Sequence, residues 1–92
     1  MSVLTVDHNF GANGVSKKSN VPLSIEYMFF ATGDFGGGTL SLEASPDDGV
    51  TWFTVDQLSK PGRLIRYLVS GERVQFCLSG ATTPNVNAGL RQ

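Results

Sequence analysis

The chain has 92 residues, of which 40% are hydrophobic, 16% are charged and 10% are aromatic. This length is enough for one hydrophobic core and too short for two, so we expect one domain over residues 1–92. The longest apolar run, residues 27–31, is too short for a membrane span or a signal-peptide core. One cysteine and one histidine exclude an internal disulfide and leave too few groups for zinc binding or His-based catalysis. We therefore expect no enzymatic activity, cofactor, metal site, small-molecule substrate or membrane contact.

The net charge of −1 hides an uneven distribution along the chain. Residues 1–59 hold two lysines against seven acids, a net charge of −5, whereas residues 60–92 hold five basic residues against one acid, a net charge of +4. Nucleic-acid-binding proteins usually carry an overall basic balance, so we expect no nucleic-acid partner. The two signs indicate complementary patches for contacts between proteins. A simple scatter of charge over exposed sheet faces explains them equally well.

Alternation of apolar and polar residues at period two predicts about seven short strands. In chain order they cover residues 3–7, 24–30, 39–44, 50–55, 64–69, 73–79 and 86–90. In the second of these, Ile25, Tyr27 and Phe29 share one face, and Glu26, Met28 and Phe30 share the other. In the fifth, Ile65, Tyr67 and Val69 share a face opposite Leu64, Arg66 and Leu68.

Turn signals separate the predicted strands, and Ser70-Gly71 predicts a two-residue hairpin between residues 64–69 and 73–79. No window places apolar residues at helical spacing, so little or no helix is expected. These features predict an all-β fold, a compact antiparallel β-sandwich of immunoglobulin-like architecture, with a small β-barrel as the alternative.

Residues 45–52 read SPDDGVTW and predict a β-hairpin turn. In this turn an Asp side chain accepts backbone N–H groups, and a glycine takes a positive φ. The segment resembles an Asp-box, a structural hairpin motif found in many unrelated β-domains. The resemblance implies that the tryptophan begins the return strand and is mostly buried beneath the turn. The matching positions are Ser45, Asp47, Gly49, Thr51 and Trp52.

The glycine-rich stretch at residues 33–38 precedes an alternating strand rather than a helix, so it predicts a flexible hairpin loop and not a phosphate-binding loop. Phe35 within it either packs on the core or faces a partner. Cys77 is expected to fill space on the second face of a central strand. His8 is expected to be a solvated residue at a strand end.

Residues 38–90 resemble small virion structural proteins of tailed bacteriophages, most strongly in the string TLSLEASPDDGVTWFTV and then in a Pro-Gly turn and a basic strand. The resemblance implies a non-enzymatic structural protein that contacts the major capsid protein or other virion proteins. Self-association remains open. It implies a location on the capsid surface of the virion, after assembly in the cytoplasm of the host bacterium. It carries no catalytic residues.

Within this group we expect a capsid decoration (cement) protein, with a tail or head-fibre component as the nearer alternative. Low charge content leaves much neutral surface for close packing against large neighbours. A candidate interface combines Phe35 with Arg63, Arg66 and Arg73, since arginine binds carboxylates in a bidentate way. The alternative from another class is a carbohydrate-binding β-sandwich module, which needs coplanar exposed aromatic residues among Trp52, Tyr27, Tyr67 and Phe35.

Overall fold

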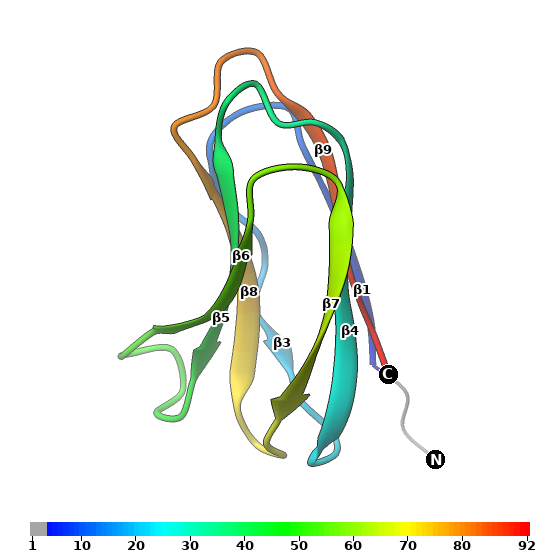
Figure 1. The fold of residues 1–92 in the computed structure, drawn as a ribbon. Helices are drawn as coiled ribbons and strands as arrows, with labels where there is room; N and C mark the ends of the chain where they lie inside the picture. Colours follow the sequence, from blue (N-terminus) through cyan, green and yellow to red (C-terminus); the bar gives the residue numbers. More distant parts are fainter. Residues whose placement is uncertain (1–3) are drawn as a thin grey trace.

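The computed structural model describes residues 4–92 and consists of two antiparallel β-sheets packed face to face (Figure 1). Every secondary-structure element assigned within these residues is a β-strand, which confirms the predicted all-β sandwich. The described residues contain no helix long and apolar enough to cross a membrane. The strands are β1 (Thr5–Phe10), β2 (Gly14–Val15), β3 (Ser19–Asn20), β4 (Ile25–Asp34), β5 (Thr39–Ser45), β6 (Phe53–Leu58), β7 (Gly62–Leu68), β8 (Arg73–Ser79) and β9 (Asn85–Arg91).

The first sheet has the strand order β1-β9-β4-β7, and the second has the order β2-β8-β5-β6, with β3 also paired to β8. Because β2 and β3 pair in succession with the same neighbour, they act as one interrupted strand. The chain then crosses between the sheets at every connection except those within β2–β3 and β5–β6. This is the strand order of a jelly roll. The sandwich predicted as immunoglobulin-like in architecture thus differs from an immunoglobulin domain in strand order, since that fold pairs its first two strands within one sheet.

The core lies between the inner faces of the two sheets. Phe29 of β4 and Phe76 of β8 stack across the interface, with ring centroids 5.9 Å apart and an interplanar angle of 18°. Tyr27 is buried beside them, and its hydroxyl donates a hydrogen bond of 2.7 Å to the Leu23 carbonyl oxygen. Alternation over residues 39–44 and 73–79 predicts one apolar face for each of these strands. In β5 and β8 those faces point inward, with Leu40, Leu42, Ala44, Val74, Phe76 and Leu78 buried.

Each of the seven predicted strands overlaps a strand of the structure, although Val3 lies outside the described residues. Residues 73–79 coincide with β8, whereas the fourth predicted strand begins at Val50 and β6 begins at Phe53. The alternating pattern does not predict β2 or β3. Each has two residues, too few for an alternating pattern to be recognised.

The predicted Ser70-Gly71 hairpin is wrong. A turn is present, because the Glu72 N–H donates to the Val69 carbonyl oxygen at 3.1 Å and Gly71 has φ 92°. However, β7 pairs with β4 and β8 pairs with β5, so this turn carries the chain from one sheet to the other. A local turn signal fixes a reversal of direction but not the partner of either strand.

The glycine-rich stretch is also a connection between sheets, not a flexible hairpin loop. The Gly36 N–H donates to the Asp34 carboxylate at 2.9 Å, and the Gly38 N–H donates to the Phe35 carbonyl oxygen at 2.8 Å. The Thr82 N–H donates to the Gly36 carbonyl oxygen at 2.9 Å, which ties this turn to the β8–β9 connection. Hydrogen bonds within the turn and from the β8–β9 connection thus hold this turn in place.

Two adjacent glycines in this turn allow a matched test of the close approach. Gly36 (φ 56°) would place a Cβ 2.1 Å from the Thr82 carbonyl oxygen, whereas Gly37 (φ 79°) has no atom within 4 Å of that position. We expect Gly37→Ala to lower the free energy of unfolding by about 1–2 kcal/mol through left-handed strain alone. Gly36→Ala should cost about 2–4 kcal/mol, because overlap is added to the strain. Equal urea midpoints for the two variants would contradict this description of the turn.

Candidate interaction surface

The Ser45–Trp52 turn is built around two side-chain oxygens. The Ser45 hydroxyl donates to Asp47 Oδ1 at 2.8 Å and accepts the Gly49 N–H at 2.8 Å. Asp47 Oδ1 also accepts the Thr51 N–H at 2.7 Å. Ser45 is fully buried, so its hydroxyl anchors the turn from within. The strands on either side, β5 and β6, pair as the predicted hairpin, with a register shift between Leu42 and Glu43.

The same hydrogen bonds set the charge state of the turn. Hydrogen bonds from the side chain and the backbone N–H of Thr51, and from the Ser45 hydroxyl, lower the pKa of Asp47 to about 2. Asp48 takes a left-handed conformation, φ 63°, before Gly49 at φ 90°. An Asp residue tolerates this region better than most side chains. Asp48 forms an ion pair with Arg73 of β8, which ties the turn to the neighbouring strand.

The burial of Trp52 differs from what the Asp-box resemblance implies. It is half-buried rather than mostly buried, lies just before β6 and is not part of the core. Of the other aromatic residues considered for a sugar-binding platform, Tyr27 and Phe35 are buried, and Tyr67 is exposed on the other sheet. The aromatic side chains considered for that platform therefore do not share one open face.

The four residues of the expected interface do not share one surface. Phe35 is 5% exposed and belongs to the core, so the expectation that it meets a partner is wrong. Arg66 faces the edge of the sandwich and forms an ion pair with Asp56 of β6, in the opposite sheet. Arg73 pairs with Asp48, as described above. Only Arg63, among these arginines, forms no ion pair within residues 4–92, and it lies exposed on the outer face of β7.

The outer face of the β1-β9-β4-β7 sheet has an apolar band over β4 and β7. Met28 lies opposite Ile65, and Phe30 lies opposite Arg63. Ile65 is 56% exposed and Tyr67 is 59% exposed. Since their strand neighbours Tyr27, Phe29 and Leu68 point into the core, this band faces solvent. The outer face of this sheet is therefore the candidate interaction surface.

Phe30 is held in place at the centre of this face. Its ring covers Gly89 of β9, where a Cβ would lie 2.2 Å from the ring. The Arg91 guanidinium lies 5.1 Å from the ring centroid, in cation–π geometry, and donates to the Asp7 carboxylate at 2.8 Å. Contacts from the neighbouring strand β9, whose Arg91 is itself paired with Asp7 of β1, thus fix an aromatic side chain that is only half-buried.

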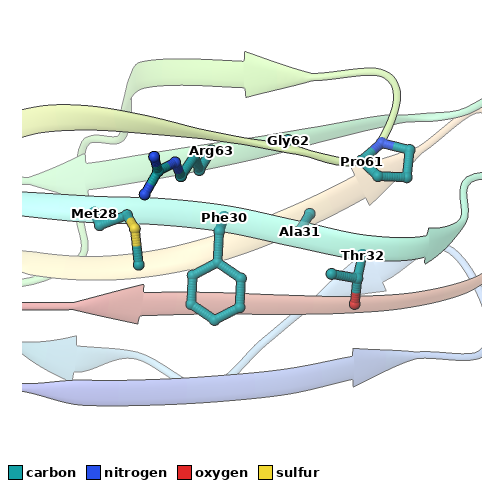
Figure 2. Close-up of a pocket in the computed structure, with 7 residues that line it drawn as sticks. All are labelled: Met28, Phe30, Ala31, Thr32, Pro61, Gly62 and Arg63. Carbon is teal, nitrogen blue, oxygen red and sulfur yellow. The ribbon is translucent and has the colours of Figure 1, made fainter.

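A groove of about 490 Å³ runs beside Phe30 (Figure 2). Met28, Phe30 and Thr32 project from the same side of β4, while Pro61, just before β7, and Arg63, near the start of β7, line the groove from the other side. A second hollow of about 380 Å³ lies on the β1–β9 side and is lined by Phe30, His8, Asn9 and Asn87, among others. Phe30 lines both hollows. The surface therefore offers an aromatic ridge with space on each side.

The outer face of the other sheet is different in kind. The Gln75 side-chain amide donates to the Glu43 carboxylate at 2.8 Å, and the Gln57 amide donates to the Ser41 hydroxyl at 3.1 Å. Cys77 lies on this face of central strand β8, partly covered as expected, and burial followed by the Glu43 charge raises the pKa of its thiol. This face satisfies its polar groups internally.

The remaining candidate groups form no chemical site in the described part of the chain. No three His, Cys, Asp or Glu side chains within residues 4–92 are placed to hold a metal ion together. His8 is not a solvated strand-end residue: it lies within β1, half-buried, with its ring edge-on to Phe10 at 4.4 Å.

Sequence reasoning missed Phe30, Ile65 and Met28 as surface residues. The signal was present, because both faces of residues 24–30 and of residues 64–69 carry large apolar side chains. One face of each strand fills the core, so large apolar side chains on the opposite face indicate a surface that contacts another element or another protein.

Comparison with known proteins gives structural neighbours only. A scan against protein-family models finds no match to this chain, and a search of curated proteins finds none. Two crystal structures of a pentameric capsid protein isolated from metagenomic phage sequences are similar in fold, each with a TM-score of 0.49 and 18% identity over 96% of this chain. This chain covers 64% of one of those chains and 60% of the other, so it spans about three-fifths of their length.

The buried hydroxyl of the turn can be tested directly. Ser45→Ala removes the acceptor of the Gly49 N–H and the donor to Asp47. We expect the free energy of unfolding to fall by about 1–3 kcal/mol in urea denaturation, the cost of leaving such groups unpaired. Ser59→Ala, at an exposed position of the next connection, should stay within about 0.5 kcal/mol of the parent. Similar losses in both variants would show that the turn does not depend on this hydroxyl.

The turn should also make stability depend on pH in the acid range. The folded-state pKa of Asp47, about 2, lies below the ordinary value of 3.8. The ionised carboxylate therefore stabilises the fold above about pH 4, and this stabilisation disappears as the pH falls towards about 2. We expect Asp47→Asn to lose less stability than the parent between these pH values, as measured by urea midpoints. Parallel pH profiles for the two proteins would contradict this role.

Proposed function

We propose that this chain is a non-enzymatic structural protein of a phage virion, most specifically a capsid decoration protein that binds the lattice of the major capsid protein as one domain. The observation that carries the proposal is the fixed aromatic ridge on the outer face of the β1-β9-β4-β7 sheet. Phe30 is held by Gly89 and Arg91 and remains partly exposed beside an apolar groove. Pre-positioned aromatic residues in a partly apolar surface are typical anchors of protein interfaces.

The chemistry of this face favours a protein surface as the partner. The groove is lined by Met28, Phe30 and Pro61, with few polar groups, so it suits an apolar side chain of a neighbouring protein. The sequence resemblance to small phage virion proteins supports the same class of partner. A virion protein repeated over a lattice would also stabilise this small domain by mass action.

Two alternatives have different support. A tail or head-fibre component uses the same surface and differs only in the virion protein that it binds. A carbohydrate-binding module is disfavoured by Tyr27 and Phe35, which are buried in the core instead of facing an open sugar-binding surface.

Occupancy of capsids by variants of the Phe30 face tests the proposal. Phe30→Ser should weaken binding to undecorated capsids by about tenfold or more, as expected for the loss of an aromatic anchor. Phe53→Ser is the matched control, because Phe53 is 60% exposed but belongs to the other sheet. Co-sedimentation over a range of protein concentrations gives both affinities.

Two further variants separate docking from folding. Gly89→Ala keeps the Phe30 side chain but forces its ring to move, and Thr32→Arg fills one wall of the groove. Each should fold, as judged by thermal melts, and bind less well than the parent. Folded variants of Phe30 and Thr32 that saturate capsids as the parent does would refute docking through this face. Binding to purified tails but not to capsids would favour the tail alternative.

A further inference from the structure

The free edges of the two sheets are not equally protected. At one edge of the second sheet, β2 and β3 are two residues each and are separated by a segment that contains Lys17 and Lys18. At its other edge, β6 follows the register shift in its pairing with β5. Short, interrupted or bulged strands resist pairing with another chain.

The β7 edge has none of the interruptions seen in the second sheet. It runs for seven residues, pairs with β4 in unbroken register, and has no neighbour on its other side in the described structure. Arg66 reaches back to the Ile65 carbonyl oxygen at 2.7 Å, and its side chain is partly exposed, so an incoming backbone N–H can replace it. A long, regular strand with a free edge is a template for strand addition.

The outward side chains of β7 suit such an addition. Ile65 and Tyr67 point to the outer face, and each is more than half exposed. The β1 edge, at the other end of this sheet, instead presents Asp7 paired with Arg91, and Asn9 hydrogen-bonded to Asn85 and Asn87. Apolar and aromatic cross-strand pairs stabilise a sheet, whereas satisfied polar ladders gain little from a new neighbour.

The charges around β7 are self-complementary. Glu26 lies opposite Tyr67 at one end of the apolar band, and Arg63 lies opposite Phe30 at the other end. Both charged residues are exposed, and neither forms an ion pair within residues 4–92. A two-fold axis through Ile65 that pairs β7 with β7 of a second copy places each Arg63 opposite the partner's Tyr67. The arginine then lies two strand spacings, about 10 Å between backbones, from the partner's Glu26.

We propose that this chain self-associates as a two-fold dimer through antiparallel pairing of β7 with β7, which joins two β1-β9-β4-β7 sheets into one. On the shared outer face, the central row reads Met28, Ile65, then the same two residues of the partner in reverse order. The rows on either side place Arg63 between Phe30 of its own chain and Tyr67 of the partner, in reach of the partner's Glu26. Each such row combines aromatic, cation–π and opposite-charge contacts.

The dimer places the two Phe30 grooves on one side of the joined sheet, so it presents a doubled version of the face proposed above for docking. It does not depend on that proposal, because self-association is measured on the purified protein alone. Each copy uses the same patch, as a two-fold interface requires.

Sedimentation equilibrium of the full chain over about 1 µM to 1 mM tests the dimer. We expect the parent to reach twice the monomer mass, and Ile65→Lys to remain monomeric. Val15→Lys is the matched control, since Val15 is 59% exposed at the edge of the other sheet, and it should dimerise as the parent does.

A charge exchange tests the symmetry of the contact. Arg63→Glu and Glu26→Lys should each weaken the dimer by about tenfold, because two-fold symmetry repeats each substitution twice. The double variant should recover most of that loss, which partner-independent effects on folding would not produce. A parent that stays monomeric throughout, an equal effect of Ile65→Lys and Val15→Lys, or no recovery in the double variant would overturn the proposal. Capsid binding by a monomeric Ile65→Lys variant would leave the Phe30 docking face standing.

Discussion

The packing of Phe29 against Phe76 is the contact on which the rest of the molecule depends. The two rings stack between the sheets at 5.9 Å, and each lies on a central strand of its own sheet. Phe29 and Phe76 belong to different sheets, so they can pack together only when the connections between β4 and β8 bring the two sheets face to face. The inter-sheet turns at Gly36 and Gly71, and the Arg66–Asp56 ion pair at the open edge, serve that arrangement.

With the inner faces committed to the core, the two outer faces are left to differ. The β8 and β5 side of the second sheet satisfies its polar side chains among themselves, through pairs such as Gln75 with Glu43. The β4 and β7 side of the first sheet instead leaves Phe30, Ile65 and Tyr67 at the surface. The sandwich therefore has one face whose polar side chains are hydrogen-bonded to each other and one face with exposed apolar side chains, and only the second is suited to bind a partner. Arg66 and Arg73 form ion pairs with Asp56 and Asp48 of the same chain, so their charges are neutralised locally. Arg63, which forms no such pair within residues 4–92, lies beside the apolar band.

The local features of the fold followed from the sequence more closely than the arrangement of its strands. Period-two alternation located β8 residue by residue and identified the inward side chains of β5, because a half-buried strand must alternate. The Ser45–Trp52 turn could be located because its hydrogen bonds are made within eight consecutive residues. The Ser70-Gly71 connection was misjudged because the partner of a strand is set by packing across the sandwich, which no local signal reports. The predicted interface was wrong for similar reasons. Phe35 packs into the core, and Arg66 and Arg73 pair with acids of other elements, Asp56 of β6 and Asp48 of the Ser45–Trp52 turn.

The outer face of the β1-β9-β4-β7 sheet, and not the polar face or the Ser45–Trp52 turn, is the surface that we propose meets other proteins in the virion. Amide hydrogen exchange of the chain, free at low concentration and bound to capsids, measures this most directly, because it reports each strand separately. If this face binds the capsid, exchange should become slower on binding in β4 and β7, with β5, β6 and β8 unchanged. Protection confined to residues 46–52 or to the strands of the second sheet would contradict it.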